Sequence, residues 1–289
     1  MYIVLKNEFG SFEIGGGGHT SARLQEIEGI GVPAKDDTPI VFEGQPGRTI
    51  IACRDLERTI TMSIDFYGDE RTVEKLYRII YKPMDIRFYL GNRRRKTHGR
   101  CIAATDITKI IYHKWQKIVL QLVCDDPYFY DFYDTAAAIS ANADQLPNLN
   151  ENGEWFVQLP AVATLRSSKA SIFNRGNTEI YPKITLANNK ETDALADEAG
   201  VILTNATTGK TIKLEYQIAT GELVTLDLKK RKIISSLSGN IITSISDDTV
   251  LEDFYLAVGE NILSIESLNT ADDIFAMAYY SNQYVSVVV

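Results

Sequence analysis

The clearest pattern in this chain is the alternation of apolar and polar side chains in residues 115–124. Ile118, Leu120, Leu122 and Cys124 share one face of an extended segment there, while Lys117 and Gln121 lie on the other face. Residues 56–67 alternate in the same way. A period of two is typical of strands that bury one face against a core. The pattern therefore predicts two half-buried β-strands in the first half of the chain.

Residues 69–82 show the spacing of one amphipathic helix, with Asp69 as its N-terminal cap and Pro83 at its end. The apolar positions at helical spacing are Val73, Leu76, Tyr77, Ile80 and Tyr81. Residues 23–47 mix short apolar pieces with Gly and Pro, which predicts a long hairpin with an exposed tip. The first half of the chain thus reads as a β domain with one packed helix.

The second half has a different pattern. Residues 135–160 are rich in Ala, Asn, Asp, Gln and Pro and show no periodicity, so we interpret them as a connecting segment. Short apolar pieces separated by glycine turns follow, which indicates a β-sandwich. The predicted fold is mainly β with a minor α element. Its predicted parts are an N-terminal domain over 1–134, a connection over 135–160, and a C-terminal galectin-like or carbohydrate-module-like β-sandwich over 161–289.

Length and composition agree with an ordinary globular protein. The chain has 289 residues, of which 45% are hydrophobic, a size that suits two domains. No apolar run approaches the roughly 20 residues that cross a bilayer. The N-terminus lacks the basic and apolar regions of a secretory signal, so we expect folding in a cytosol and no membrane insertion.

Charge is divided unevenly between the halves. Residues 1–134 hold equal numbers of basic and acidic side chains, so the net charge of −8 falls on residues 135–289. An acidic surface repels a phosphate backbone, because tight binding requires clustered cations. We therefore expect no specific binding of nucleic acid, although DNA could pass such a surface without adhering.

No motif supplies catalytic chemistry, and we expect no enzyme, cofactor or metal site. Adjacent aspartates on a strand point to opposite faces, so turn and cap roles explain the pairs at 125–126, 247–248 and 272–273 better than catalysis or calcium. His19, His98 and His113 lack metal-binding spacing. Residues 207–211 mimic the end of a phosphate-binding loop, but their context predicts a hairpin. The three cysteines, Cys53, Cys101 and Cys124, are expected to be buried thiols.

One basic cluster, Arg93, Arg94, Arg95 and Lys96, follows the predicted turn at 91–92. Two interpretations stay open for it. It is either the solvated flank of a hairpin or an oligomer interface that pairs with carboxylates of a neighbouring subunit, since guanidinium groups bind carboxylates in a fork geometry.

The strand at 115–124 ends in a knot of aromatic and acidic residues. We call Asp125, Asp126, Pro127, Tyr128 and Phe129 the junction motif, because Pro127 stops the strand and the motif marks the end of the first domain. Three further stretches follow in order, Asn174–Pro182, Gly221–Asp227 and Phe254–Asn261. Together, these four stretches resemble the distal tail protein family of siphophages, a phage tail component at the baseplate hub that is also found in prophages.

The resemblance implies a structural protein of the virion tail tip, assembled in the cytoplasm of the bacterial host. It implies a homo-oligomeric ring, expected to be a hexamer, that the first domain forms and that joins the tail tube to the baseplate. The implied partners are the tail tube protein, a tail-tip protein and a receptor-binding protein. We hypothesise that the predicted helix, the predicted long hairpin and the basic stretch at 93–96 supply the ring contacts.

Two other classes stay open at this point. One is a carbohydrate-binding adhesion module that recognises host cell-wall glycan through rings of the second domain: Trp155, Tyr181, Tyr216, Tyr255, Tyr279, Tyr280 and Tyr284. The other is a hydrolase of cell-wall polymer, which would need carboxylates brought together from distant parts of the chain.

Overall fold

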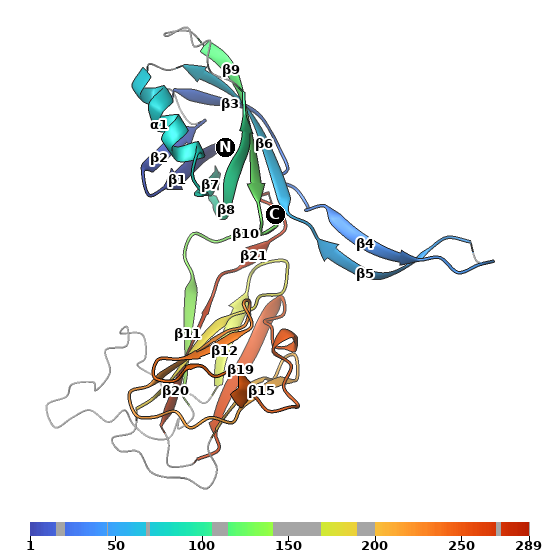
Figure 1. Ribbon diagram of the computed structural model, residues 1–289, viewed down its shortest axis with the longest axis vertical. Coiled ribbons are helices and arrows are strands. Elements are labelled where there is room, and N and C mark those ends of the chain that lie inside the picture. Colours follow the sequence, from blue (N-terminus) through green and yellow to red (C-terminus); the bar gives the residue numbers. More distant parts are fainter. Residues whose placement is uncertain are drawn as a thin grey trace, which may run out of the picture. The chain divides into compact units, whose positions relative to one another are not determined.

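The computed structural model describes residues 1–15, 21–44, 46–67, 70–105, 115–140, 169–189, 200–269 and 273–288 (Figure 1). The chain divides into two compact units, Met1–Phe132 with Gln283–Val289, and Tyr133–Asn282. The described residues form β-strands, one α-helix and two short 3-10 turns, so the predicted mainly β fold is confirmed. No helix among them is long and apolar enough to span a bilayer.

The first unit is built on one strongly bent antiparallel sheet in the order β2-β1-β7-β8-β9-β6-β3. Its strands are β1 (Tyr2–Asn7), β2 (Gly10–Ile14), β3 (Ala22–Glu28), β6 (Arg58–Tyr67), β7 (Met84–Leu90), β8 (Arg93–Ala104) and β9 (Trp115–Cys124). Strand β8 belongs to both halves of this sheet, because its first part pairs with β7 and its last part pairs with β9. The short strands β10 (Phe129–Tyr130) and β21 (Gln283–Tyr284) pair with each other, and β10 also pairs with β8.

The two halves of the bent sheet enclose one core. Ile3 and Phe88 from the first half lie in the same cluster as Met62 and Leu120 from the second half, and all four side chains are fully buried. Burying such a side chain stabilises the fold by about 1.5–3 kcal/mol. The predicted alternation in residues 115–124 and 56–67 is confirmed, since β9 and β6 pair along their full length and turn their apolar faces to this core.

The single helix, α1 (Glu70–Ile80), confirms the helix expected at 69–82. Leu76, Ile79 and Ile80 are buried against the core, and the helix lies next to β1 and β2. The expected cap Asp69 lies outside the described residues. The helical spacing of the apolar residues thus predicted which side of α1 is buried.

A separate two-stranded hairpin, β4 (Lys35–Ile40) and β5 (Thr49–Asp55), extends away from the packed strands of the first unit (Figure 1). The sequence placed a long hairpin at 23–47, which is wrong in its bounds. Residues 22–28 instead form β3 at the edge of the main sheet, where they pair with β6. The difference arises because β3 has few apolar residues, so the spacing of its apolar and polar residues does not predict a strand.

The second unit has two sheets. The larger one, in the order β11-β20-β13-β16-β17-β18, contains β11 (Thr135–Ser140), β20 (Ile274–Tyr280), β13 (Lys183–Asn188), β16 (Leu223–Asp227), β17 (Lys232–Ser235) and β18 (Gly239–Asn240). The smaller one, in the order β12-β19-β14-β15, contains β12 (Lys169–Asn174), β19 (Gly259–Ser267), β14 (Val201–Asn205) and β15 (Lys210–Leu214). Residues 242–244 and 251–253 form the 3-10 turns.

Both sheets of the second unit contribute to one apolar core, as a sandwich requires. Ile184, Leu226 and Ile265 are fully buried in it. Ile262 is 39% exposed, because it follows the buried Asn261 on β19 and so points to the other face.

The unit boundaries differ from the predicted ranges at two places. Residues 135–140 form β11 in a sheet of the second unit, although they were assigned to the connection. The C-terminal residues 283–289 pack with the first unit, although they were assigned to the second domain. The rest of the expected connection, from 141 to 160, lies outside the described residues.

Candidate assembly surfaces

The junction motif closes the first unit through a network around one carboxylate. Asp126 accepts hydrogen bonds from the backbone N–H of Tyr128 (3.1 Å) and from the hydroxyl of Tyr130 (2.5 Å). Burial and the charge of Asp126 together raise the pKa of Tyr130, so this hydroxyl stays protonated and remains a donor. The hydroxyl of Tyr128 donates to Asp55 (2.6 Å), which lies at the end of β5. The motif is therefore bonded to the base of the hairpin.

Arg58 is the buried centre of this region. The residue is only 3% exposed, yet no carboxylate among the described residues forms an ion pair with its side chain. Its guanidinium donates to four backbone carbonyls, those of Gly29 (2.6 Å), Gly31 (2.7 Å), Pro127 (2.7 Å) and Val285 (2.8 Å). It also lies 4.4 Å from the centre of the Phe129 ring. Arg58 thus joins the end of β3, the junction motif and the C-terminal segment.

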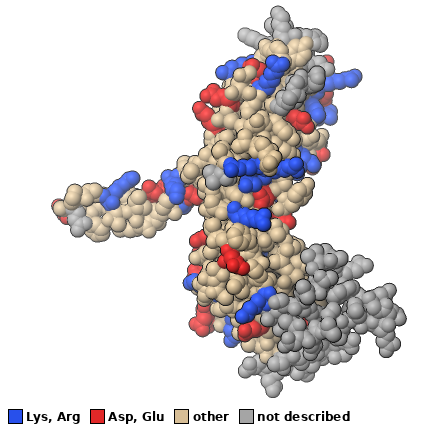
Figure 2. All heavy atoms as spheres, turned by 180° about the vertical axis from the view of Figure 1, so that it is seen from behind, with Lys and Arg blue, Asp and Glu red and all other residues tan. Residues whose placement is uncertain are grey.

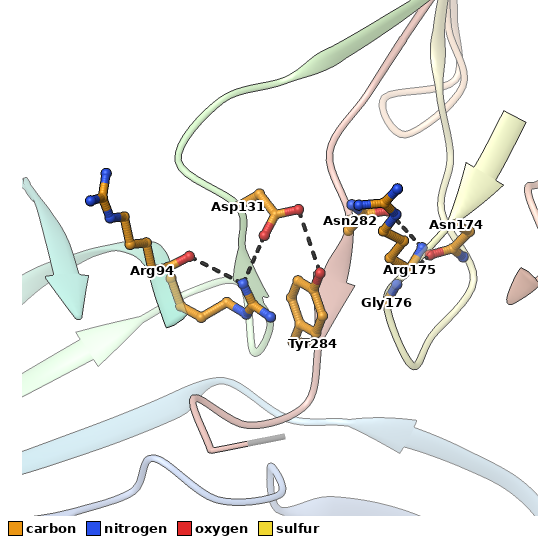
Figure 3. A network of polar contacts seen from close by, with 8 residues as sticks. Arg94, Asp131, Asn174, Arg175, Gly176, Asn282 and Tyr284 are labelled. Carbon is orange, nitrogen blue, oxygen red and sulfur yellow. Dashed lines mark hydrogen bonds and ion pairs between the residues drawn. The ribbon is translucent and has the colours of Figure 1, made fainter. Parts of the chain in front are cut away.

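A second arginine holds the returning C-terminal strand. Arg95 donates to the Asp131 carboxylate (2.8 Å) and to the carbonyl of Arg94 (3.2 Å), and its guanidinium lies 3.5 Å from the centre of the Tyr284 ring (Figure 3). Tyr284 in turn donates to Asp131 at 3.4 Å. A guanidinium between a carboxylate and an aromatic ring is favourably placed for both interactions. Beside it, the Lys96 ammonium donates to the carbonyl of Phe132 (3.0 Å).

The four residues of the basic stretch therefore have different surroundings. Arg95 and Lys96 are half-buried and bonded within the first unit. Arg93 and Arg94 are exposed, and their guanidinium groups have no partner among the described residues. Arg94 points away from the Arg95 network in Figure 3. The oligomer interface expected at 93–96 stays a prediction, and only part of the stretch is available for it.

The β4–β5 hairpin exposes apolar side chains on both strands and at its tip. The exposed fractions are 71% for Val41, 51% for Phe42 and 59% for Ile51. Charged residues hold its strands in register, since Arg54 pairs with Asp36 at 2.8 Å. Both signs of charge are visible along the hairpin in Figure 2. An isolated two-stranded ribbon is only marginally stable in water, so these exposed apolar side chains indicate a surface made for contact.

In the second unit, the stretch that begins at Asn174 forms a tight polar turn (Figure 3). The side-chain oxygen of Asn174 accepts from the backbone N–H of Gly176 (2.8 Å), and its amide donates to the carbonyl of Thr178 (2.8 Å). The Asn282 side chain accepts from the N–H of Arg175 (2.9 Å). Asn174 is 1% exposed, so this residue has a structural role in starting the sandwich.

The last of the four stretches ends in another buried asparagine. Asn261 is fully buried, and its side chain bonds to the N–H and the carbonyl of Ala257 (2.8 and 2.7 Å) and to the carbonyl of Gly259 (3.1 Å). The Asn205 amide also donates to it, at 3.3 Å. Buried polar side chains require such partners. The motif therefore closes a loop of the second unit.

The described residues contain no group of three or more His, Cys, Asp or Glu side chains that could hold a metal ion. His98 is exposed and lies 3.1 Å from Asp85. Glu222 is a buried carboxylate, but Tyr216, Ser235 and the backbone N–H of Ala219 already bond to it. His19, His113 and Asp272 lie outside the described residues. Residues 207–211 lie in the turn and second strand of the β14–β15 hairpin, as expected.

The cysteines differ from the prediction that all three are buried. Cys124 is fully buried in the core, and this burial raises its pKa to about 11. Cys101 is half-buried, and Cys53 is exposed. Cys53 lies on the β4–β5 hairpin, where it pairs in register with Asp37. The prediction that Cys53 is buried was wrong because it assumed that every strand packs against a core.

Comparison with known proteins gives these features a context. Residues 175–284 match the family model described as siphovirus-type tail component, C-terminal domain. No curated protein matches the sequence. The chain is similar to the crystal structure of the Dit protein (gp 19.1) of SPP1, described as a paradigm of the hub adsorption apparatus in phages that infect Gram-positive bacteria. That likeness has a TM-score of 0.61 at 16% identity and covers 91% of this chain and 93% of the other.

Two structures of the phage P2 baseplate in its activated conformation, with Ca and with Sr, match with TM-scores of 0.49 and 0.44. Each has 10% identity and covers 96% of this chain and 97% of the other. The family match confirms the resemblance to siphophage tail components over residues 175–284, and the structural likeness to the SPP1 protein shows the same fold.

Sequence reasoning singled out the junction motif and the basic stretch but missed Arg58 and the C-terminal return. Arg58 is the first residue of β6 and shares the face of Ile60 and Met62, but a charged residue at the start of a strand gave no reason to expect a buried cation. Its carbonyl partners are scattered from residue 29 to residue 285, and carbonyls have no signature in a sequence. Only the contacts between distant segments reveal its role.

Proposed function

We propose that this chain is a distal tail protein that forms a six-membered ring at the tip of a phage tail. In this role the first unit makes the ring, and the ring joins the tail tube to the baseplate and its receptor-binding proteins. The second unit carries the family domain and docks those partners. DNA passes through the ring without specific binding.

The observation that carries the ring is the exposed apolar surface of the β4–β5 hairpin. A closed ring of identical subunits needs two different, complementary patches on each subunit. Val41, Phe42 and Ile51 are hydrophobic side chains on a ribbon without a core of its own, and a neighbouring subunit would bury them. Each could contribute about 1.5–3 kcal/mol if the contact buries it fully. Helix α1 and the exposed side chains of Arg93 and Arg94 are further candidates for the facing patches.

The rival function, binding of cell-wall glycan through aromatic rings, receives less support. Stacking on sugars requires exposed rings. Tyr181, Tyr216, Tyr255, Tyr279 and Tyr280 are only half-exposed, and Tyr181 packs against Tyr255 with ring centres 6.3 Å apart. Tyr284 is 6% exposed and belongs to the first unit, and Trp155 lies outside the described residues.

The experiment compares two single charge substitutions in the full chain by size-exclusion chromatography with light scattering. Val41→Asp places a carboxylate on the hairpin and should raise the concentration needed for ring formation at least tenfold, because the contact would have to desolvate the charge. Leu237→Asp is the matched control, since Leu237 is also 71% exposed but lies in the second unit. Equal assembly of both variants would contradict a role of the hairpin in the ring.

A further inference from the structure

The bent sheet of the first unit has two outward faces with different charges. Because the two halves turn their apolar residues to one shared core, their other faces point away from it on opposite sides. One outward face lies on β1, β7 and β8, and the other lies on β3, β6 and β9. In a head-to-tail contact, one face of each copy binds a different face of the next copy, so each subunit needs two such faces.

The first outward face is basic. On β7, Ile86 and Phe88 point into the core, so Arg87 and Tyr89 point outward, and their partners on β8 are Lys96 and Arg94. Lys6 lies on the same side of β1. We call Lys6, Arg87, Arg94 and Lys96 the basic face.

The basic face also has an aromatic part. Tyr2 and Tyr89 stack with ring centres 4.3 Å apart, and the Phe132 ring packs edge-on against Tyr89 at 5.1 Å. Arginine and aromatic side chains together are characteristic of the centres of protein–protein interfaces. Figure 2 shows Lys and Arg side chains gathered in a band on one side of the molecule.

The second outward face is acidic along β3. Glu26 and Glu28 pair in register with Ser63 and Thr61 on β6, and both are exposed. Glu57 is also exposed and lines a pocket at the base of the hairpin. We call Glu26, Glu28 and Glu57 the acidic face. None of these three carboxylates has an ion pair or a side-chain hydrogen bond among the described residues.

Three cations lie on the same side as these carboxylates. Arg23 lies over the Trp115 ring at 4.4 Å, and Lys117 pairs in register with Asp65. Arg100 lies 3.9 Å from Asp125. Among the described residues, none of the three forms an ion pair with Glu26, Glu28 or Glu57, and Lys6 and Arg94 of the basic face also have no ion-pair partner.

We propose that the basic face of one subunit binds the acidic face of the next subunit, so that Lys6 and Arg94 of one copy lie against Glu26 and Glu28 of its neighbour. This inference rests on the proposed function, because it presupposes a ring of copies. It assigns the carboxylate partner of the basic stretch and adds a second, electrostatic contact to the hydrophobic contact of the hairpin. Charge complementarity of this kind fixes the register and speeds association.

A nucleic-acid ligand fits the basic face less well than a second copy. Asp85 and Glu13 lie on the same face as Lys6 and Arg87, and a phosphate backbone would be repelled by both carboxylates. A protein partner can place cations beside Asp85 and Glu13 and carboxylates beside Lys6 and Arg94. The acidic face of a second copy of this chain offers such carboxylates.

The test uses charge reversal in the full chain, with native mass spectrometry and light scattering as readouts. One variant carries Glu26→Lys and Glu28→Lys, and the other carries Lys6→Glu and Arg94→Glu. All four side chains are exposed and unpaired within the described residues, so folding should be retained. Each variant alone should need at least a tenfold higher concentration to form rings. The matched controls, Glu266→Lys and Lys232→Glu, change exposed residues of the second unit that belong to neither face, and they should assemble like the unmodified protein.

Mixing the two reversed variants gives the decisive result. If the two variants alternate around the ring, each contact again joins opposite charges. An equimolar mixture should therefore form rings with an even number of subunits, at the same protein concentration as the unmodified protein. Assembly of either reversed variant alone at that concentration, or a mixture that fails to assemble, would overturn the inference while leaving the ring itself intact. Absence of any ring from the unmodified chain would instead overturn the proposed function and this inference with it. Binding of single-stranded DNA that both basic substitutions abolish, without any effect on assembly, would assign the basic face to nucleic acid.

Discussion

At the scale of single residues, the first unit depends on one buried cation that neutral groups satisfy. Arg58 carries its charge at 3% exposure with carbonyl oxygens of Gly29, Gly31, Pro127 and Val285 as partners. Desolvation lowers its pKa, yet guanidinium groups stay protonated in proteins. A guanidinium offers five donors in a rigid plane, whereas a lysine ammonium offers three donors at one point. Gly29 lets the chain after β3 lie close to β6, because a Cβ atom at this position would be 1.9 Å from the Thr59 carbonyl oxygen.

Replacement of Arg58 by Met should lower the free energy of unfolding by about 3 kcal/mol or more, because it leaves buried carbonyls without donors. Urea denaturation followed by intrinsic fluorescence would measure the loss. Arg100→Met is the control, since Arg100 is exposed and makes only a 3.9 Å contact with Asp125, so its replacement should change stability by about 0.5 kcal/mol or less. Equal stabilities for the two variants would show that the four carbonyl contacts contribute little.

At the scale of elements, the C-terminal segment completes a unit that the chain left 150 residues earlier. Strand β21 pairs with β10, Tyr284 lies against Arg95, and Ser286 donates to the carbonyl of Ile30 at 3.0 Å. Val287 is 1% exposed in the same core as the main sheet. This segment therefore belongs to the stability of the first unit and carries no part of the sandwich.

Ending the chain after Asn282 should destabilise the first unit and leave the second unit folded. The deletion removes one carbonyl from Arg58, the ring from Arg95 and an apolar side chain from the core, each contact being worth roughly 1–3 kcal/mol. Hydrogen exchange read by mass spectrometry should show faster exchange in β3, β6 and β10 and unchanged exchange in β13 and β16. Removing Val288 and Val289 alone is the control. Uniform protection in both units after the longer deletion would contradict the assignment.

Helices and strands could be predicted from the sequence wherever they bury one face in a core, because burial makes their apolar residues recur at a regular spacing. The helix at 70–80 and the strands at 58–67 and 115–124 follow directly from apolar spacing, because each buries one face. The hairpin and β3 could not be placed correctly, since β4 and β5 have no core and β3 is an edge strand with four exposed positions. The contacts of Arg58 and Arg95 could not be foreseen because their partners come from segments far apart in the sequence.

At the scale of the whole molecule, we propose that the protein is a building block of a phage tail. Residues 175–284 of the second unit match the siphovirus-type tail component domain, and the first unit presents a hydrophobic hairpin and two outward faces with different charges. The buried side chains of Glu222 and Asn261 bond to groups within the second unit. The central claim is therefore that copies of this chain assemble into a closed ring.

Negative-stain images of the purified full-length protein, combined with native mass spectrometry, test this claim most directly. We predict closed rings with sixfold symmetry and a mass six times that of the 32.3 kDa chain. A protein that remains a monomer at every accessible concentration, alone and with its tail partners, would contradict the account, as would an open filament or a twofold dimer.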